Sequence, residues 1–171
     1  MRAALLVASV ALLVGAVPSA AGHSAADLRL PRAAAAGETT QYGHIKSLRR
    51  VGARYELRFD PALWLGGVTA ERAAVQDGAI RPGQPVPNDY YIVDEGHRLL
   101  TFLVPRTARV TVLTNGINST RITIAELAQI VKGRNPRHRP LYDRGNNLGY
   151  WLLVSYRYPS AVRSIDQQYQ P

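Results

Sequence analysis

The chain reads YELRFD at residues 55–60, where apolar side chains alternate with charged ones. A period of two residues places the aromatic and leucine side chains on one face of a strand and the charged side chains on the other. Residues 44–51 precede this strand across Gly52-Ala53, and such a short connection predicts a β-hairpin. We therefore expect a β-rich domain built around a half-buried antiparallel hairpin.

Further strand signals follow the hairpin. Residues 98–104 and 109–114 are predicted strands that a Pro-Arg-Thr turn joins. Residues 99–104 are apolar on both faces apart from Thr101, a pattern typical of a central or doubly covered strand. The other predicted strands are residues 90–93, 150–156 and 162–169.

Two helices are expected between the strands. Thr69 is placed to cap a short helix at about residues 70–77, and Gly78 is placed to end it. Residues 123–126 read Thr-Ile-Ala-Glu, which is the spacing of a capping box. An apolar stripe follows, so a well-capped second helix is predicted at about residues 123–132.

The order of the elements indicates the fold class. It is strand, strand, helix, three strands, helix, two strands, without the regular alternation of a doubly wound fold. We expect a mainly β or α+β domain with a small twisted antiparallel sheet or a partly open barrel. In outline it resembles an oligonucleotide/oligosaccharide-binding barrel. Residues 45–48 and 162–165 share an apolar-basic-Ser-apolar pattern, which favours pairing of the first and last strands.

The N-terminus reads as an export signal. Arg2 precedes an apolar run at residues 3–17, which is short for a membrane span, and small residues follow Pro18. We expect residues 1–21 to be a signal peptide cleaved after Ala21, with cleavage after Ala26 as the second choice and an uncleaved anchor as the alternative. The prediction is a secreted or extracytoplasmic protein with a disordered Ala-rich spacer at 22–41 and one globular domain at 42–171.

Composition excludes several classes of site. The chain has 171 residues and no cysteine, which rules out disulfides, thiolate zinc sites, a cysteine nucleophile and a lipidated cysteine. Hydrophobic residues make up 46% and charged residues 19%, which indicates a packed core. With 21 Lys and Arg against 12 Asp and Glu, the formal net charge is +9. The protein is therefore strongly basic.

Short segments spread in order along residues 43–171 carry a resemblance to a known family. They are GHIKS (43–47), FD (59–60), WL (64–65), AA (73–74), DG (77–78), NDYYI (88–92), IT (122–123), EL (126–127), YW (150–151), Val162, Ile165 and QYQP (168–171). The chain resembles an uncharacterised family of small exported single-domain proteins of Gram-positive bacteria. The resemblance implies export and a single domain, but no activity, because none is established for that family. The basic loop at 134–144 departs from the family as an insertion.

One polar and aromatic segment is a candidate ligand site. Asn88, Asp89, Tyr90 and Tyr91 follow a proline and combine an amide, a carboxylate and two phenols, which suit a sugar or a peptide. The alternative is a turn in which the Asn and Asp side chains bind nearby backbone groups. Trp64 and Trp151, with nine tyrosines in the chain, present the same choice between stacking on sugar rings and packing in the core.

A basic loop is the second candidate. It contains four arginines and a histidine, and a second basic cluster lies at residues 46–54. On an exported protein the nearest polyanions are cell-envelope polymers, anionic lipids and extracellular DNA, and charge attracts them without sequence specificity. An ordinary solvated surface is the alternative, and nucleic acid is not favoured as the main partner. The residues of the predicted patch are Arg134, Arg137, His138, Arg139 and Arg144.

Catalytic motifs are not recognisable in the chain. It has no Gly-x-Ser-x-Gly elbow and no His-x-x-x-His pair, and its acidic residues lack the spacing of an EF-hand. We therefore predict no catalytic residues, no metal and no cofactor. The favoured function is an exported non-catalytic module with a basic surface for anionic cell-envelope or extracellular ligands. The alternatives are a small exported hydrolase with an unrecognised site and an inhibitor or partner-binding protein.

Overall fold

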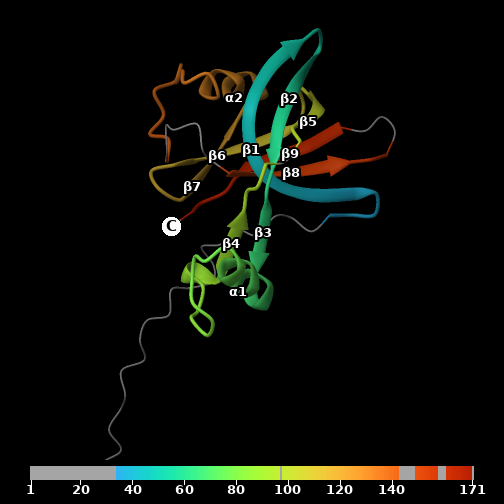
Figure 1. The fold of residues 1–171 in the computed structure, drawn as a ribbon. Helices are drawn as coiled ribbons and strands as arrows, with labels where there is room; N and C mark the ends of the chain where they lie inside the picture. The colour runs from blue at the N-terminus through green and yellow to red at the C-terminus, as the bar shows by residue number, and fades with distance from the viewer. Residues whose placement is uncertain (1–33, 97, 143–148, 158–160, 171) are drawn as a thin grey trace, which may run out of the picture.

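The computed structural model describes residues 34–96, 98–142, 149–157 and 161–170. These residues form a seven-stranded sheet, a two-stranded sheet and two α-helices (Figure 1). The predicted signal peptide and Arg144 lie outside the described residues. The elements in chain order are β1 (Glu38–Val51), β2 (Arg54–Pro61), β3 (Leu63–Gly66), α1 (Gly67–Gln76), the 3₁₀ turn η2 (Pro87–Asp89), β4 (Tyr90–Val93), β5 (Leu100–Pro105), β6 (Arg109–Thr114), β7 (Asn118–Ile122), α2 (Ile124–Ile130), β8 (Gly149–Ser155) and β9 (Ala161–Gln167).

The predicted hairpin is confirmed. β1 and β2 pair antiparallel, with Val51 opposite Arg54 across a turn in which Gly52 has a φ of 57°. Leu57 and Phe59 of the alternating segment are fully buried. β1 begins at Glu38, inside the segment for which sequence predicted a spacer, because its first half pairs with β8.

Gly43 lies where β1 changes partner. Residues 38–44 pair with β8 and residues 43–51 pair with β2, and a register shift lies between Ile45 and Ser47. A Cβ added to Gly43 would stand 2.1 Å from the carbonyl oxygen of Asp60. Glycine is therefore needed at this crossing, where the two backbones approach too closely for any side chain.

The large sheet has the order β5-β2-β1-β8-β9-β6-β7. β6 and β9 run parallel, so the sheet is mixed and not purely antiparallel as predicted. The predicted pairing of the first and last strands is wrong, because β8 lies between β1 and β9 and pairs with both. β5 also contacts β9, so the sheet curls toward a partly open barrel without closing among the described residues.

β5 lies at one edge of the sheet, so the prediction of a central or doubly covered strand is wrong. Its two faces have different surroundings. Val104 is fully buried, and the ring of Phe102 contacts that of Phe59 with centroids 6.2 Å apart. Leu103 on the other face is 45% exposed. The apolar run therefore reflects one buried face and an uncovered leucine on the other.

The second helix has the predicted cap. Thr123 accepts a hydrogen bond of 3.1 Å from the backbone N–H of Glu126, and α2 buries Ile124 and Leu127 against the main core. The position of the first helix was predicted, but its cap was not. α1 begins after Gly66, and Thr69 lies inside its first turn, where its hydroxyl donates to the Gly66 carbonyl at 2.7 Å.

The smaller elements form a unit of their own. Ala70 and Ala74 of α1 pack with Val86 and with partly buried side chains of the β3–β4 ribbon, in a cluster separate from the main core. In Figure 1 this unit extends below the large sheet, whereas α2 lies against β1 and β6 at the other end. Among the described residues, no helix has the length and apolar character needed to cross a membrane.

Candidate functional site

Aromatic rings gather where the β3–β4 ribbon joins the large sheet. Trp64 of β3 stacks on Tyr90 of β4, with centroids 4.1 Å apart and an interplanar angle of 18°. Tyr42 of β1 packs edge-on against Trp64 at 5.0 Å and also contacts Trp151 of β8 at 5.1 Å. Four strands therefore contribute one ring each to a continuous cluster.

The cluster is held by the C-terminal segment. Gln170 donates a hydrogen bond to the phenol oxygen of Tyr42, and the Tyr142 hydroxyl donates to the Gln170 carbonyl. The indole N–H of Trp151 donates to Gln168 at 3.0 Å. Burial raises the pKa of Tyr42, the hydrogen bond from Gln170 opposes that effect, and the charges of Tyr90 and Asp94 add to it. This phenol is therefore a neutral structural group.

A groove of about 550 Å³ opens beside the cluster. It runs along the first half of β1 and is bounded by the start of β3 and the end of β8. Both tryptophans of the chain line it. Its lining residues are Thr39, Thr40, Gln41, Tyr42, Pro61, Ala62, Leu63, Trp64, Trp151 and Tyr156. None of these side chains carries a charge. We call this hollow the aromatic groove.

A buried histidine lies behind the same cluster. His44 is 5% exposed, and its Nε2 lies 3.5 Å from Oδ2 of Asp94, just beyond β4. Its Nδ1 has no hydrogen-bond partner among the described residues. The contact between His44 and Asp94 joins the β3–β4 ribbon to the large sheet. The ring of His44 also packs edge-on against that of Tyr42, with centroids 6.0 Å apart.

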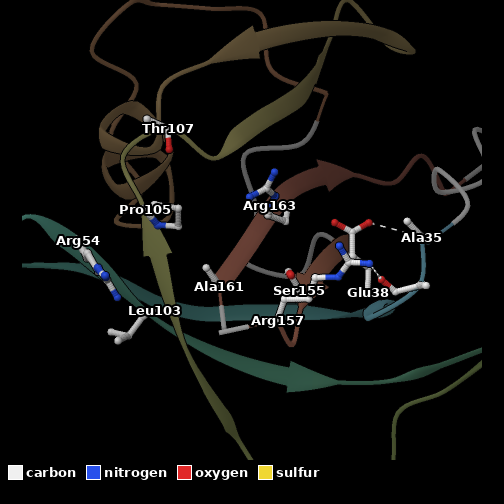
Figure 2. Close-up of a pocket in the computed structure, with 11 residues that line it drawn as sticks. Ala35, Glu38, Arg54, Leu103, Pro105, Thr107, Ser155, Arg157, Ala161 and Arg163 are labelled. Carbon is white, nitrogen blue, oxygen red and sulfur yellow. Dashed lines mark hydrogen bonds between the residues drawn. The ribbon is translucent and has the colours of Figure 1, made fainter. Parts of the chain in front are cut away.

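Three arginines line a second hollow, of about 470 Å³ (Figure 2). They are Arg54 at the start of β2, Arg157 just after β8 and Arg163 in β9. In this view Arg163 lies between Arg54 on one side and Arg157 with Glu38 on the other. Arg157 donates to the Ala36 carbonyl at 2.8 Å. We call this site the arginine hollow.

Electrostatics of the arginine hollow favour an anion. Arg54 and Arg163 have no acidic partner among the described residues, and both are exposed. The lining contains one carboxylate, Glu38, which accepts a 3.3 Å hydrogen bond from the Ala35 backbone. Three guanidinium groups against one carboxylate leave a net positive lining. The hydroxyls of Ser155 and Thr107 add neutral donors to it.

The predicted segment at residues 88–91 lies outside both hollows. Asn88 and Asp89 are exposed in a tight turn, with φ values of 59° and 58°. Tyr90 lies behind Trp64, and Tyr91 donates to Asp77 at 3.0 Å, a hydrogen bond that raises the pKa of Tyr91. The two phenols therefore have structural contacts, and direct ligand binding by this segment stays a prediction.

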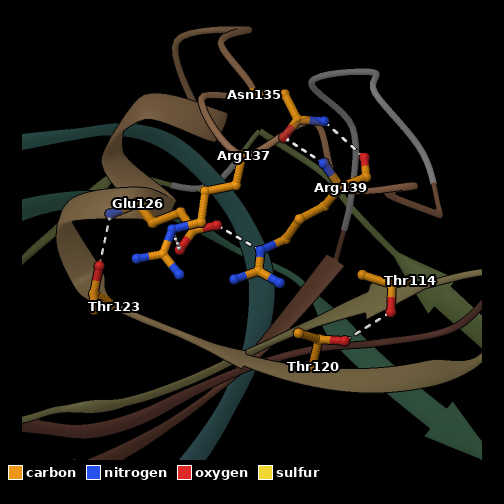
Figure 3. A network of polar contacts seen from close by, with 7 residues as sticks. All are labelled: Thr114, Thr120, Thr123, Glu126, Asn135, Arg137 and Arg139. Atoms are coloured by element: carbon orange, nitrogen blue, oxygen red, sulfur yellow. Dashed lines mark hydrogen bonds and ion pairs between the residues drawn. The ribbon is translucent and has the colours of Figure 1, made fainter.

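The predicted basic loop has an internal acidic partner. Arg139 donates to Oε1 of Glu126 at 2.6 Å, and Arg137 lies 3.6 Å from the other oxygen of the same carboxylate (Figure 3). The hydrogen bond to Glu126 raises the pKa of Arg139. Arg134 donates to Gln129 at 3.4 Å, and His138 occupies a turn with a φ of 50°. These contacts reduce the free charge that the loop presents to a ligand.

The second basic cluster, at residues 46–54, also has acidic partners for some of its side chains. Lys46 pairs with Asp60 at 2.9 Å and Arg49 with Glu56 at 2.7 Å, whereas Arg54 turns toward the arginine hollow. Sequence reasoning grouped Arg54 with its chain neighbours and missed Arg157 and Arg163. The register of the predicted hairpin could have separated Arg54 from Lys46 and Arg49. Only the tertiary fold, however, places Arg54, Arg157 and Arg163 around the same hollow.

In the part of the chain that the structure describes, no group of three or more His, Asp or Glu side chains could hold a metal ion. Comparison with protein-family models, curated proteins and solved structures finds no match to this chain. The resemblance to small exported proteins of Gram-positive bacteria therefore stays a prediction.

Proposed function

We propose that the protein is an exported, non-catalytic module that binds an anionic ligand in the arginine hollow. The observation that carries the proposal is that Arg54, Arg157 and Arg163 line one cavity. Guanidinium groups bind phosphate and carboxylate oxygens through paired, charge-assisted hydrogen bonds. Export rests on the N-terminal signal pattern, and it makes the anionic polymers of the cell envelope the ligand class that we favour.

Ion pairs elsewhere on the surface support this location. Arg49, Arg109 and Arg139 each bind an acidic side chain, so much of their charge is already compensated. In the hollow, Arg54 and Arg163 have no acidic partner among the described residues, so their charge is not compensated there. A cavity of about 470 Å³ suits one charged unit of a polymer better than a flat contact with many charges.

The test measures retention of the purified protein on cell walls with and without their anionic teichoic acid, over a salt series. We expect the double variant Arg54→Gln/Arg163→Gln to bind about tenfold or more weakly, because a loss of about 1.4 kcal/mol of charge-assisted binding energy is a tenfold change in affinity. Binding of the unchanged protein should weaken as salt rises.

The matched control is Arg72→Gln/Arg121→Gln, which removes the same charge from exposed positions outside the hollow. We expect it to keep most of the binding. Equal losses in the two double variants would show attraction by diffuse charge and contradict the proposed site. Equal retention on walls with and without teichoic acid would contradict an anionic ligand.

A further inference from the structure

We propose that the aromatic groove is a second binding site and that its ligand is an uncharged glycan chain. The chain has 33 charged residues, 21 basic and 12 acidic, yet all ten residues that line the groove are uncharged. A charged ligand would lose its hydration there without gaining an ionic partner. The groove therefore selects a neutral ligand, in contrast to the arginine hollow.

The tryptophan rings are held in place before any ligand arrives. Tyr90 supports one face of Trp64, and Tyr42 packs against both Trp64 and Trp151. Gln168 fixes the indole N–H of Trp151. Rings ordered in this way lose little conformational entropy when a ligand binds. The C–H faces of a pyranose ring are suited to the negative faces of such aromatic rings.

Polar groups at the rim suit the hydroxyls of a sugar. Thr39, Thr40 and Gln41 line the groove, and their side chains have no hydrogen-bond partner among the described residues. Together they offer two hydroxyls, an amide donor and an amide acceptor. An apolar surface with a few available polar groups is the usual composition of a small-ligand site.

Exposed apolar side chains mark the same groove. Tyr156 is 62% exposed and Leu63 is 54% exposed, and both belong to its lining. Large apolar groups exposed together at one hollow indicate a surface that a ligand covers. These two side chains give the groove open walls beside the half-buried tryptophans.

An extended peptide fits the groove less well than a glycan. A peptide would pair with the edge of β1, where backbone groups face the open side at alternate residues. Tyr42 already accepts there from Ala62 at 3.0 Å, and the Glu38 N–H already donates to Ala35 at 2.9 Å. Thr40 is left between them, and one residue offers too few main-chain bonds for strand addition.

Tryptophan emission reports on the groove, because both tryptophans of the chain line it. We would titrate the purified protein with four uncharged tetrasaccharides: chitotetraose, cellotetraose, maltotetraose and mannotetraose. The expected result is a saturable change in emission with at least one of them. Calorimetry should give the same affinity. No binding of any of the four up to about 10 mM, a limit that corresponds to about −3 kcal/mol, would overturn the proposal.

Three variants locate the binding. Tyr156→Ala removes an exposed wall of the groove, so the core should remain folded, and we expect about fivefold weaker binding or more. Ile117→Ala removes a 46% exposed apolar side chain outside the groove and should bind as the unchanged protein does. Equal loss in both variants would overturn the assignment to the groove. Arg54→Gln/Arg163→Gln should keep saccharide binding, which separates this inference from the proposed anion site.

The peptide alternative is part of the same experiment. An uncharged, blocked hexapeptide of alternating Thr and Val is titrated under the same conditions. Binding of this peptide without binding of any saccharide would show that the groove accepts a strand and would overturn the glycan proposal. Binding of a saccharide alone supports it.

Discussion

Nε of Arg139 donates a hydrogen bond of 2.6 Å to Oε1 of Glu126, thirteen residues earlier in the chain. The carboxylate belongs to α2 and its side chain is 5% exposed, whereas the arginine comes from the basic loop. The loop is therefore attached to the helix by an ion pair that is largely buried on the acidic side. A buried carboxylate requires such partners, because loss of hydration is otherwise uncompensated.

Replacement of Glu126 tests this attachment. In Glu126→Ala, Arg139 loses its hydrogen-bond acceptor and Arg137 loses its ion-pair partner, and we expect the free energy of unfolding to fall by about 2 kcal/mol. Urea unfolding monitored by circular dichroism measures the change. Glu71→Ala is the control, since Glu71 is exposed on α1 and has no ion pair among the described residues. Similar stabilities for the two variants would contradict a structural role for the pair.

The two threonines at the helix starts are expected to differ. Thr123 accepts from the backbone N–H of Glu126, so Thr123→Ala should lower the free energy of unfolding by about 1 kcal/mol. Thr123→Ser keeps the hydroxyl acceptor, so it should retain most of the free energy of unfolding that Thr123→Ala loses. Thr69 only donates to the Gly66 carbonyl, so Thr69→Ala should lose less than about 0.5 kcal/mol. Thermal unfolding of the three variants measures these differences, and an equal loss at Thr69 and Thr123 would refute the assigned caps.

Gly149 is expected to tolerate no side chain. A Cβ there would stand 1.8 Å from the phenol oxygen of Tyr42, which belongs to the aromatic cluster. Gly149→Ala forces Tyr42 to move and should destabilise the fold by about 1–3 kcal/mol. The control is Gly66→Ala, where the nearest atom is 3.8 Å from the added Cβ, and the loss should be smaller. Chemical unfolding measures the free energy of unfolding of the two variants. An unchanged value in Gly149→Ala would contradict the close contact between Gly149 and Tyr42.

Alkaline pH should destabilise the protein through Tyr42. Burial raises the pKa of this phenol, and in the unfolded chain a tyrosine titrates at about 10. Below about pH 10 the contribution of Tyr42 to the free energy of unfolding does not change with pH. Above it the unfolded state loses a proton that the folded state keeps, so the free energy of unfolding falls by up to about 1.4 kcal/mol per pH unit for each such proton.

The measurement is urea unfolding between about pH 9 and 11, where the tyrosines of the unfolded chain titrate. Tyr42→Phe should show a shallower decline of the free energy of unfolding with pH than the unchanged protein. A decline remains in the variant, because the pKa of Tyr90 and of Tyr91 is raised as well. Identical slopes in the two proteins would show that Tyr42 does not couple folding to pH.

Local patterns in the sequence identified much of the secondary structure. The alternation at residues 55–60 predicted β2, the Gly52-Ala53 connection predicted its hairpin with β1, and Thr123 predicted the start of α2. Each depends on residues close together in the chain. The short helix was placed with the wrong cap, because α1 begins at Gly67 with Gly66 as its N-cap, and Thr69 lies inside the first turn.

Strand order was not accessible in the same way. The apolar run at 99–104 suggested a central strand, yet β5 is an edge whose buried face rests on the core. The shared pattern at 45–48 and 162–165 suggested a pairing that β8 prevents. A side-chain pattern reports which faces are buried, but it does not report which strand supplies the covering surface.

The candidate sites show the same difference between what local sequence patterns predict and what long-range contacts decide. Residue types in the sequence established a cysteine-free, basic and mainly β protein with a capped helix, because composition, alternation and caps depend on the residues themselves and their near neighbours. Only the tertiary structure decided that Glu126 pairs with Arg137 and Arg139 of the basic loop and that Arg54, Arg157 and Arg163 share one hollow. It also brought Trp64 and Trp151, 87 positions apart in the chain, into one groove. These contacts join distant segments, and they form only when the strands pair and the sheet curls.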